Sequence, residues 1–139
     1  VARSIHANKP IRTTMGLIEA LKGLEGRGKA SQFLAQVFQA LRMQVNNELA
    51  VLESMLQQSV EVLKSNGRLV VISYHSLEDR MVKELLRTGN VQGELKKDFF
   101  GNIQREMNPL KAKPILPTKE ELERNKRSRS AKLRVGIKK

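Results

Sequence analysis

The sequence contains no cysteine and no tryptophan, and its aromatic residues are one tyrosine and four phenylalanines among 139 residues. Without cysteine the chain has neither disulfides nor a thiol nucleophile, a composition that suits a reducing cytoplasm. No apolar run is long enough to span a membrane, and no signal peptide is visible at the start. With 40% hydrophobic residues, the chain can still bury a core of aliphatic side chains in one ordinary domain.

Acidic residues are also missing from the last sixteen positions, where residues 124–139 contain eight Lys or Arg. This segment carries two-thirds of the net charge of +12, which predicts a polyanionic partner and nucleic acid first among them. A disordered, solubilising tail is the alternative. Apolar residues alternate with polar or small ones over 131–137, and this pattern favours an ordered strand.

The strongest local signal is the apolar run at 69–72, rich in β-branched residues and introduced by the turn residues Asn66 and Gly67. An uninterrupted run predicts a strand that is buried on both faces, as at the centre of a parallel sheet. Ser76, three residues before Asp79, predicts a capping box that starts the next helix. The expected unit is therefore a strand, a short polar turn and a helix.

Polar side chains follow this strand directly. Ligands of open α/β sheets bind beyond the carboxyl ends of the strands, so Tyr74, His75 and Ser76 are candidate pocket residues. His75 has no partner residues with the spacing of a metal site or a catalytic triad. Hydrogen bonding within the turn, or contact with a substrate, is therefore the expected role of its imidazole. For Asp79, capping the helix is the default role.

Hydrophobic periodicity predicts further helices, with a bend or break in the longest one at Asn46-Asn47, since asparagine is a poor residue for a helix interior. On that helix Arg42 and Asn46 share one face, and spacing alone favours a solvated or inter-helix pair. The predicted helices span 2–8, 14–22, 30–64, 76–87 and 119–125, with a loop at 23–28 and short strands at 115–116 and 131–137.

The only aromatic cluster is Phe99-Phe100, which follows two lysines and precedes Gly101. Exposed aromatic residues beside lysines can stack on nucleobases. Buried phenylalanines are the commoner case, so the sequence favours a core anchor at a turn.

Four segments resemble motifs of one protein family, the MraW methylases (ribosomal RNA small subunit methyltransferase H). Residues 67–80 (GRLVVISYHSLEDR) resemble its hallmark, and 38–49 (FQALRMQVNNEL) resemble its FQALR motif. Residues 127–134 (RSRSAKLR) resemble its closing motif, and 10–14 (PIRTT) also fit. The four lie in the family's order across nearly the whole chain, and Lys126 stands where a proline is usual.

The resemblance implies an S-adenosylmethionine-dependent enzyme that methylates the exocyclic N4 of a cytidine in 16S ribosomal RNA. Its fold would be a class I, Rossmann-like α/β sheet with an all-α domain inserted after the fourth strand. Residues 1–46 would be the end of the helical insert, and 47–139 the C-terminal part of the methyltransferase domain. The chain is therefore expected to be the later part of a longer cytoplasmic protein.

The resemblance also implies roles for particular residues. No position matches the family's cofactor residues, so S-adenosylmethionine is expected in the parent protein and not on this chain. The partner would be small-subunit ribosomal RNA, held largely through its phosphates. The implied residues are Tyr74, His75 and Ser76 at the target-base pocket, Arg42 and Asn46 facing the RNA from the insert, and Arg127, Arg129, Lys132 and Arg134 at phosphates.

A non-catalytic basic RNA-binding module remains the alternative function, and a glycine-rich strand–loop–helix upstream of Val1 would favour the enzyme. The strand at 68–74 would lack the fourth strand as its neighbour, and an open strand edge recruits other strands. Self-association through 68–74, or a rearranged, swapped strand pairing, is therefore expected.

Overall fold

The computed structural model of the protein describes residues 1–26 and 29–139. Residues 27 and 28, at the end of the predicted loop 23–28, lie outside the described residues. The chain divides into two units, Val1–Glu48 and Leu49–Lys139. The division lies two residues beyond the boundary between 46 and 47 that the sequence suggested.

The first unit is helical, with α1 (Ala2–Ala7), α2 (Thr14–Leu21) and α3 (Ala30–Val45). The Thr13 hydroxyl caps α2 by accepting a hydrogen bond from the backbone N–H of Gly16 at 3.0 Å. Threonine is a favoured N-cap residue, because its hydroxyl pairs with an otherwise free N–H of the first turn.

The break predicted at Asn46-Asn47 is confirmed, because α3 ends there and α4 (Glu48–Val62) starts anew. Asn47 has a φ of 53°, in the left-handed region that asparagine tolerates better than most residues.

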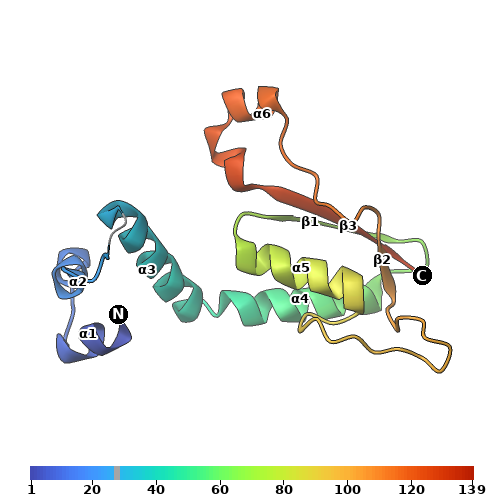
Figure 1. Ribbon diagram of the computed structural model, residues 1–139, viewed down its shortest axis with the longest axis horizontal. Coiled ribbons are helices and arrows are strands. Elements are labelled where there is room, and N and C mark those ends of the chain that lie inside the picture. Colours follow the sequence, from blue (N-terminus) through green and yellow to red (C-terminus); the bar gives the residue numbers. More distant parts are fainter. Residues whose placement is uncertain (27–28) are drawn as a thin grey trace. The chain divides into compact units, whose positions relative to one another are not determined.

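The second unit combines a small sheet with helices (Figure 1). The predicted helix over 119–125 and strand over 131–137 are both present, whereas no pattern in the sequence indicated β2 or the 3₁₀ helix η1. Among the described residues, no helix has both the length and the apolarity to cross a membrane. Besides α4, the elements are β1 (Arg68–Ser73), α5 (Ser76–Thr88), β2 (Met107–Pro109), α6 (Lys119–Arg124), η1 (Lys126–Ser130) and β3 (Lys132–Lys138).

The sheet has the strand order β1-β3-β2, and both pairings are antiparallel. Arg68 lies opposite Ile137, and Ser73 lies opposite Lys132. The prediction that β1 lies at the centre of a parallel sheet is therefore wrong for this chain. β1 is an edge strand, because the described residues supply a neighbour on one side only.

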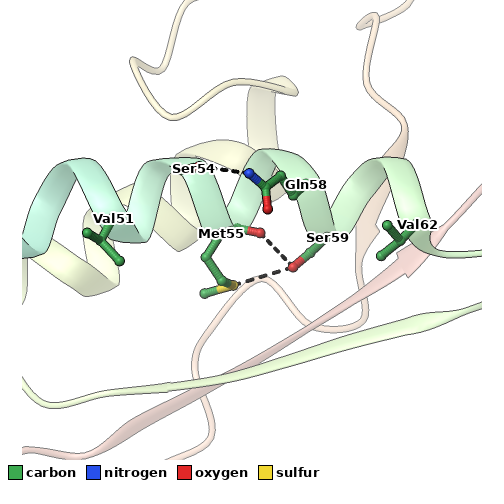
Figure 2. A pocket seen from close by; sticks show the side chains of 6 residues that line it. All are labelled: Val51, Ser54, Met55, Gln58, Ser59 and Val62. Atoms are coloured by element: carbon green, nitrogen blue, oxygen red, sulfur yellow. Dashed lines mark hydrogen bonds between the residues drawn. The ribbon is translucent and has the colours of Figure 1, made fainter.

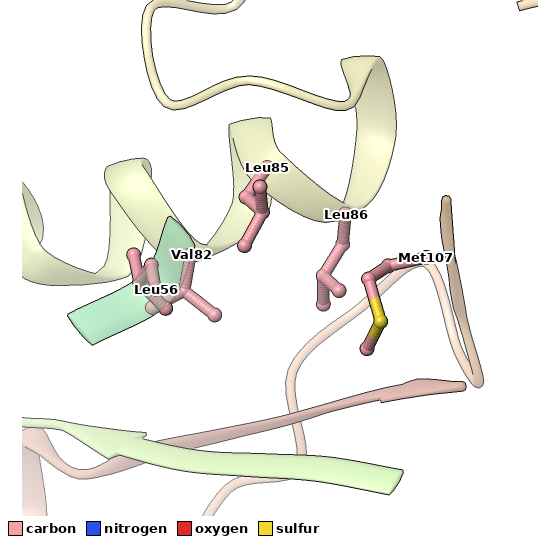
Figure 3. Packing of buried hydrophobic residues seen from close by; sticks show 5 residues of the cluster. All are labelled: Leu56, Val82, Leu85, Leu86 and Met107. Carbon is pink, nitrogen blue, oxygen red and sulfur yellow. The ribbon is translucent and has the colours of Figure 1, made fainter. Parts of the chain in front are cut away.

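The core lies between one face of the sheet and the helices α4 and α5 (Figures 1 and 3). Leu69 and Val71 of β1 pack on it. At Gly136 of β3 an added Cβ would lie 2.3 Å from a methyl carbon of Leu86, so only glycine allows this approach of strand and helix. The buried cluster consists of Leu56, Val82, Leu85, Leu86 and Met107.

The opposite face of the sheet is largely open. Val70 and Ile72 are 56% and 55% exposed, although the uninterrupted apolar run predicted burial on both faces. Their partners across the strand pair, Val135 and Leu133, share this face. The prediction of burial on both faces is wrong here, because α4 and α5 both cover the same side. We call the covered side the inner face and the open side the outer face.

Candidate functional site

The turn after β1 is held by a capping box that starts at His75 and not, as predicted, at Ser76. The Nδ1 atom of His75 accepts a hydrogen bond from the backbone N–H of Glu78 at 3.4 Å. The carboxylate of Glu78 in turn accepts from the backbone N–H of Tyr74 and of His75, at 3.0 and 3.4 Å. The prediction missed the box by one residue, because histidine is not among the usual capping residues.

The second ring nitrogen of His75 faces the same carboxylate. Its Nε2 lies 3.0 Å from Oε1 of Glu78, yet it makes no hydrogen bond of acceptable geometry within the described residues. Both nitrogens of His75 point back into the turn, so its main role here is to fix the start of α5.

A pocket of about 250 Å³ lies beside this turn, at the end of the outer face. Tyr74, 57% exposed, belongs to its wall, whereas His75 and Ser76 do not line it. The wall is mostly apolar, with Glu121 as its one ionisable carboxylate. The complete lining is Ile72, Tyr74, Ile115, Leu116, Pro117, Glu121, Asn125, Ser128, Ala131 and Leu133.

The 3₁₀ helix η1 forms one side of this pocket, with one buried residue among four exposed ones. Ser128 is buried, and its hydroxyl donates to the backbone carbonyl of Asn125 at 2.7 Å. The Asn125 side chain accepts from the backbone N–H of Arg127 at 3.2 Å. Arg127 and Arg129, on either side of Ser128, are exposed. The Arg-Ser-Arg spacing thus places one hydroxyl at the pocket wall and two guanidinium groups in solvent.

Arg134 is placed differently from the two arginines of η1. It is 9% exposed and forms a bidentate pair with Asp79 on α5, through Nε at 2.7 Å and Nη2 at 3.3 Å. The ammonium of Lys132 lies 3.3 Å from the same carboxylate. Both cations were predicted at RNA phosphates, and Asp79 was predicted only as a cap. The contacts instead tie β3 to α5.

Burial by itself would raise the pKa of Asp79, which is only 7% exposed. The hydrogen bonds and charges of Arg134, and then those of Lys132, outweigh burial and hold the pKa below its usual 3.8. Asp79 is therefore ionised at neutral pH, and Arg134 is committed to it.

Arg42 and Asn46 meet at Glu48, all three within the first unit. Arg42 makes two contacts to this carboxylate, at 2.9 Å from Nε and 3.2 Å from Nη2. The side-chain amide of Asn46 donates to Oε1 of Glu48 at 3.2 Å. The arrangement matches the structural pair that spacing favoured, and the sequence alone did not identify Glu48 as its acid.

A second hollow runs along α4 and is shown in Figure 2. All of its lining residues come from this one helix, and none of them is ionisable. The serine and glutamine side chains bond to their own helix, as Ser59 does to the carbonyl of Met55 at 2.7 Å. It is an apolar strip of a helix and not a chemical site. In the described ranges there is also no group of three or more His, Cys, Asp or Glu that could hold a metal ion.

The whole chain, residues 1–139, matches the sequence profile of the MraW methylase family. The chain belongs to this family. A relative from Amoebophilus asiaticus, named ribosomal RNA small subunit methyltransferase H, is 56% identical over 135 residues, which is 97% of this chain and 43% of the relative. Relatives of the same name from Parabacteroides distasonis and Cytophaga hutchinsonii are each 52% identical, over 94% and 93% of this chain and 43% of their own length. The chain thus spans less than half the length of these relatives.

Two of the MraW-like motifs meet in three dimensions at the carboxyl end of β1. The hallmark at 67–80 supplies β1, the capped turn and Asp79, while the closing motif at 127–134 supplies Ser128 and Arg134. Sequence reasoning missed the part played by Asn125 and Ser128. Their spacing of three residues, in front of a predicted strand, was the available signal for a capped turn.

Proposed function

We propose that this chain is the C-terminal part of an S-adenosylmethionine-dependent methyltransferase that modifies the N4 atom of a cytidine in 16S ribosomal RNA. In this proposal the chain binds RNA and forms one side of the pocket for the target base. The match to the MraW methylase family over all 139 residues carries the proposal. The shared name of the relatives, ribosomal RNA small subunit methyltransferase H, supports the same reaction class.

The intact protein would have a Rossmann-like sheet in which β1 is the fifth strand and β3 the antiparallel seventh. The open edge of β1 and the open outer face would then be covered by strands and helices from the rest of the protein. Residues 1–46 would be the end of the all-α insert. The exposed apolar side chains Val70 and Ile72 support this arrangement, because an uninterrupted apolar strand is typical of a sheet covered on both faces.

Methylation of an exocyclic amine depends chiefly on alignment, since the amine must face the methyl donor before it loses a proton. The target cytidine must leave its stack to reach such a site. Tyr74 offers a half-exposed ring at the pocket wall, on which a flipped base would stack. His75 and Ser76 would act through the turn by holding Tyr74 in place. No residue of the chain is proposed as an acid, a base or a nucleophile.

Arg127 and Arg129 are the proposed phosphate contacts, because both are exposed beside the pocket. Lys132 is a weaker candidate, being 39% exposed and engaged by Asp79. Arg42 and Asn46 would face RNA from the helical insert with Glu48 orienting the guanidinium. Arg134 is not proposed as a phosphate contact, because RNA would have to displace the buried carboxylate of Asp79 to reach it.

The residues of this chain do not fit the whole methyl donor. The pocket, about 250 Å³, is smaller than the roughly 300–1,000 Å³ typical of cofactor sites. Its one carboxylate, Glu121, is engaged by Arg124 and Asn125, at 3.0 and 3.3 Å. S-adenosylmethionine is therefore assigned to the rest of the parent protein, and the pocket here is proposed for a base.

Methyl transfer tests the proposal. The protein at its natural length is incubated with small ribosomal subunits and radiolabelled S-adenosylmethionine, and the product nucleoside is identified by mass spectrometry. We expect N4-methylcytidine, with transfer reduced about tenfold or more by Tyr74→Ala and less by Tyr74→Phe, since losing one base stack costs about 1–3 kcal/mol.

Val62→Ala is the matched control for Tyr74→Ala, because it truncates an exposed side chain on α4. If Tyr74→Ala transfers methyl groups as fast as the wild type, the pocket at Tyr74 is not the binding site of the target base. RNA binding with no methyl transfer would instead favour the non-catalytic RNA-binding module.

A further inference from the structure

Phe99 and Phe100 are the most exposed large hydrophobic residues of the second unit, at 97% and 85% exposure. The prediction that they anchor the core is therefore wrong. Their rings pack against each other, edge to face, with centroids 5.6 Å apart and planes at 87°. Exposing two adjacent aromatic side chains to water is unfavourable for the free protein. Such exposure indicates a surface that binds a partner.

The residues that carry the two rings form a built hairpin, here called the 96–104 hairpin. Lys97 bridges to Ile103, and Gln104 N–H donates to the carbonyl of Lys96 at 2.8 Å. At the tip, the carboxylate of Asp98 accepts from the backbone N–H of Phe100 and of Asn102, at 2.9 and 2.8 Å. The tip thus presents both rings without any support from the core.

Gly101 completes the tip with a φ of 86°, a conformation that favours glycine. At the base of the hairpin, Arg105 donates to the carbonyl of Arg87 at the end of α5, at 3.0 Å, and to Asn108 in β2, at 3.1 Å. The hairpin is therefore fixed to the second unit and extends away from α5 and β2 (Figure 1).

The charges around the rings select one kind of partner. Lys96 and Lys97 are exposed on the hairpin. Asp98 is the one acid within 96–104, and both of its carboxylate oxygens accept hydrogen bonds from donors within the tip. Exposed aromatic faces beside cations that carry no local acid partner match single-stranded nucleic acid, whose bases stack and whose phosphates attract lysine.

We propose that the 96–104 hairpin binds single-stranded RNA by stacking Phe99 and Phe100 on unpaired nucleobases, as a second RNA contact beyond the pocket at Tyr74. This inference rests on the proposed function, because it assumes that the protein meets RNA. The hairpin adds affinity and fixes the position of the RNA, and it takes no part in methyl transfer.

Binding of a mixed-sequence 12-nucleotide RNA with a central 2-aminopurine tests the hairpin, using the protein at its natural length. We expect 2-aminopurine fluorescence to fall on binding to the wild type. Phe99→Ala/Phe100→Ala should lose this quenching and weaken binding by about tenfold or more. The salt dependence should stay unchanged, since no phosphate contact is removed. The thermal unfolding midpoint should also stay unchanged, because the rings are exposed.

Two further variants separate stacking from general apolar contact. Phe99→Leu/Phe100→Leu keeps the apolar surface and should bind RNA as weakly as the alanine variant. Leu95→Ala, which truncates a half-exposed aliphatic residue just before the hairpin, should bind like the wild type. Full affinity in the leucine variant would overturn stacking.

The outcomes distinguish this inference from the function on which it rests. If Phe99→Ala/Phe100→Ala binds RNA like the wild type while Arg127→Ala/Arg129→Ala does not, the hairpin inference fails and the proposed function stands. If the wild type does not bind the RNA or small ribosomal subunits, the proposed function itself fails. If the alanine variant no longer binds phosphatidylglycerol vesicles but keeps its RNA binding, the inference is overturned in favour of a membrane surface.

Discussion

The inner and outer faces belong to the same three-stranded sheet, but they have different surroundings. On the inner face, Leu69 and Val71 pack under α4 and α5, and Arg134 is paired with Asp79. On the outer face, Val70 and Ile72 are more than half exposed. A strand alternates its side chains between the two faces. One apolar run can therefore supply a core on one side and an open surface on the other.

The basic segment 124–139 shows the same division in its charges. Arg127 and Arg129 of η1 point into solvent beside the pocket. Along β3, Arg134 pairs with Asp79, and Lys138 pairs with Glu106 and donates to the carbonyl of Val60. Net charge therefore overstates the charge available to RNA, since part of it is used to join β3 to its neighbours.

Breaking the buried pair of Arg134 and Asp79 should lower the stability of the fold more than any other change predicted below. It tests whether the inner face is closed. Arg134→Ala leaves the carboxylate of Asp79 buried with only Lys132 to face it, so we expect the free energy of unfolding to fall by about 3 kcal/mol. Lys132→Ala, at a partly exposed pair, should cost at most about 1 kcal/mol. Urea unfolding of each variant measures both.

A double variant that removes both charges sharpens this prediction. Asp79→Leu/Arg134→Met removes both charges and should cost less than Arg134→Ala alone, because no unpaired charge stays buried. A loss below about 1 kcal/mol for Arg134→Ala would mean that the pair is solvated and that the inner face is not closed.

The outer face should decide whether the chain self-associates. By itself the 139-residue chain is expected to pair through the free edge of β1. Val70→Lys/Ile72→Lys places two charges beside that edge without touching the core, and should restore a monomer in light scattering. Val62→Lys, on an exposed site of α4, is the control. A chain that is already monomeric at high concentration would contradict self-association.

The exposed arginines of η1 should control the salt dependence of RNA binding. Removing one phosphate contact lowers the slope of log affinity against log salt by about 0.7 units for single strands. Arg127→Ala/Arg129→Ala should therefore flatten it by about 1.4 units, with unfolding unchanged. Lys64→Ala/Lys139→Ala removes the same charge at the other end of the sheet and should alter the slope less. An equal change in both would indicate a general charge effect.

Acid should weaken the inner face by a smaller amount. The folded-state pKa of Asp79 lies below its usual 3.8, so its pairing stabilises the fold fully above that pH. This contribution is lost as the pH falls through the lower, folded-state value. Unfolding free energies measured from pH 6 to pH 3 should fall less steeply in Asp79→Asn than in the wild type, by at most about 1.4 kcal/mol per pH unit. Parallel curves would exclude Asp79 as a source of acid sensitivity.

Local patterns in the sequence were sufficient for many of the elements. Thr13 caps α2, the asparagines at 46–47 end α3, and Gly89, with a φ of 89°, ends α5. Each is a short-range effect, because a cap or a left-handed residue acts within one turn of the chain. The family motifs are also sequence features, so family membership needed no coordinates.

The candidate site was predicted only in part. Tyr74 does border a pocket, but the wall opposite comes from 115–117, η1 and β3, which lie 40 or more residues away in sequence. Sequence patterns report local preference and do not say which distant segments meet. For the same reason β2 was missed: its three residues form a strand only because β3 lies beside them.

The sequence by itself determined the approximate extent of the α-helices, that the final segment is a strand, and that the chain carries a basic end. Only the tertiary structure decided that Arg134 pairs with Asp79 across 55 positions while Arg127 and Arg129 remain exposed. It also decided that Phe99 and Phe100 stand in solvent. Residue type fixes what a side chain can bind, but packing decides what is left within its reach.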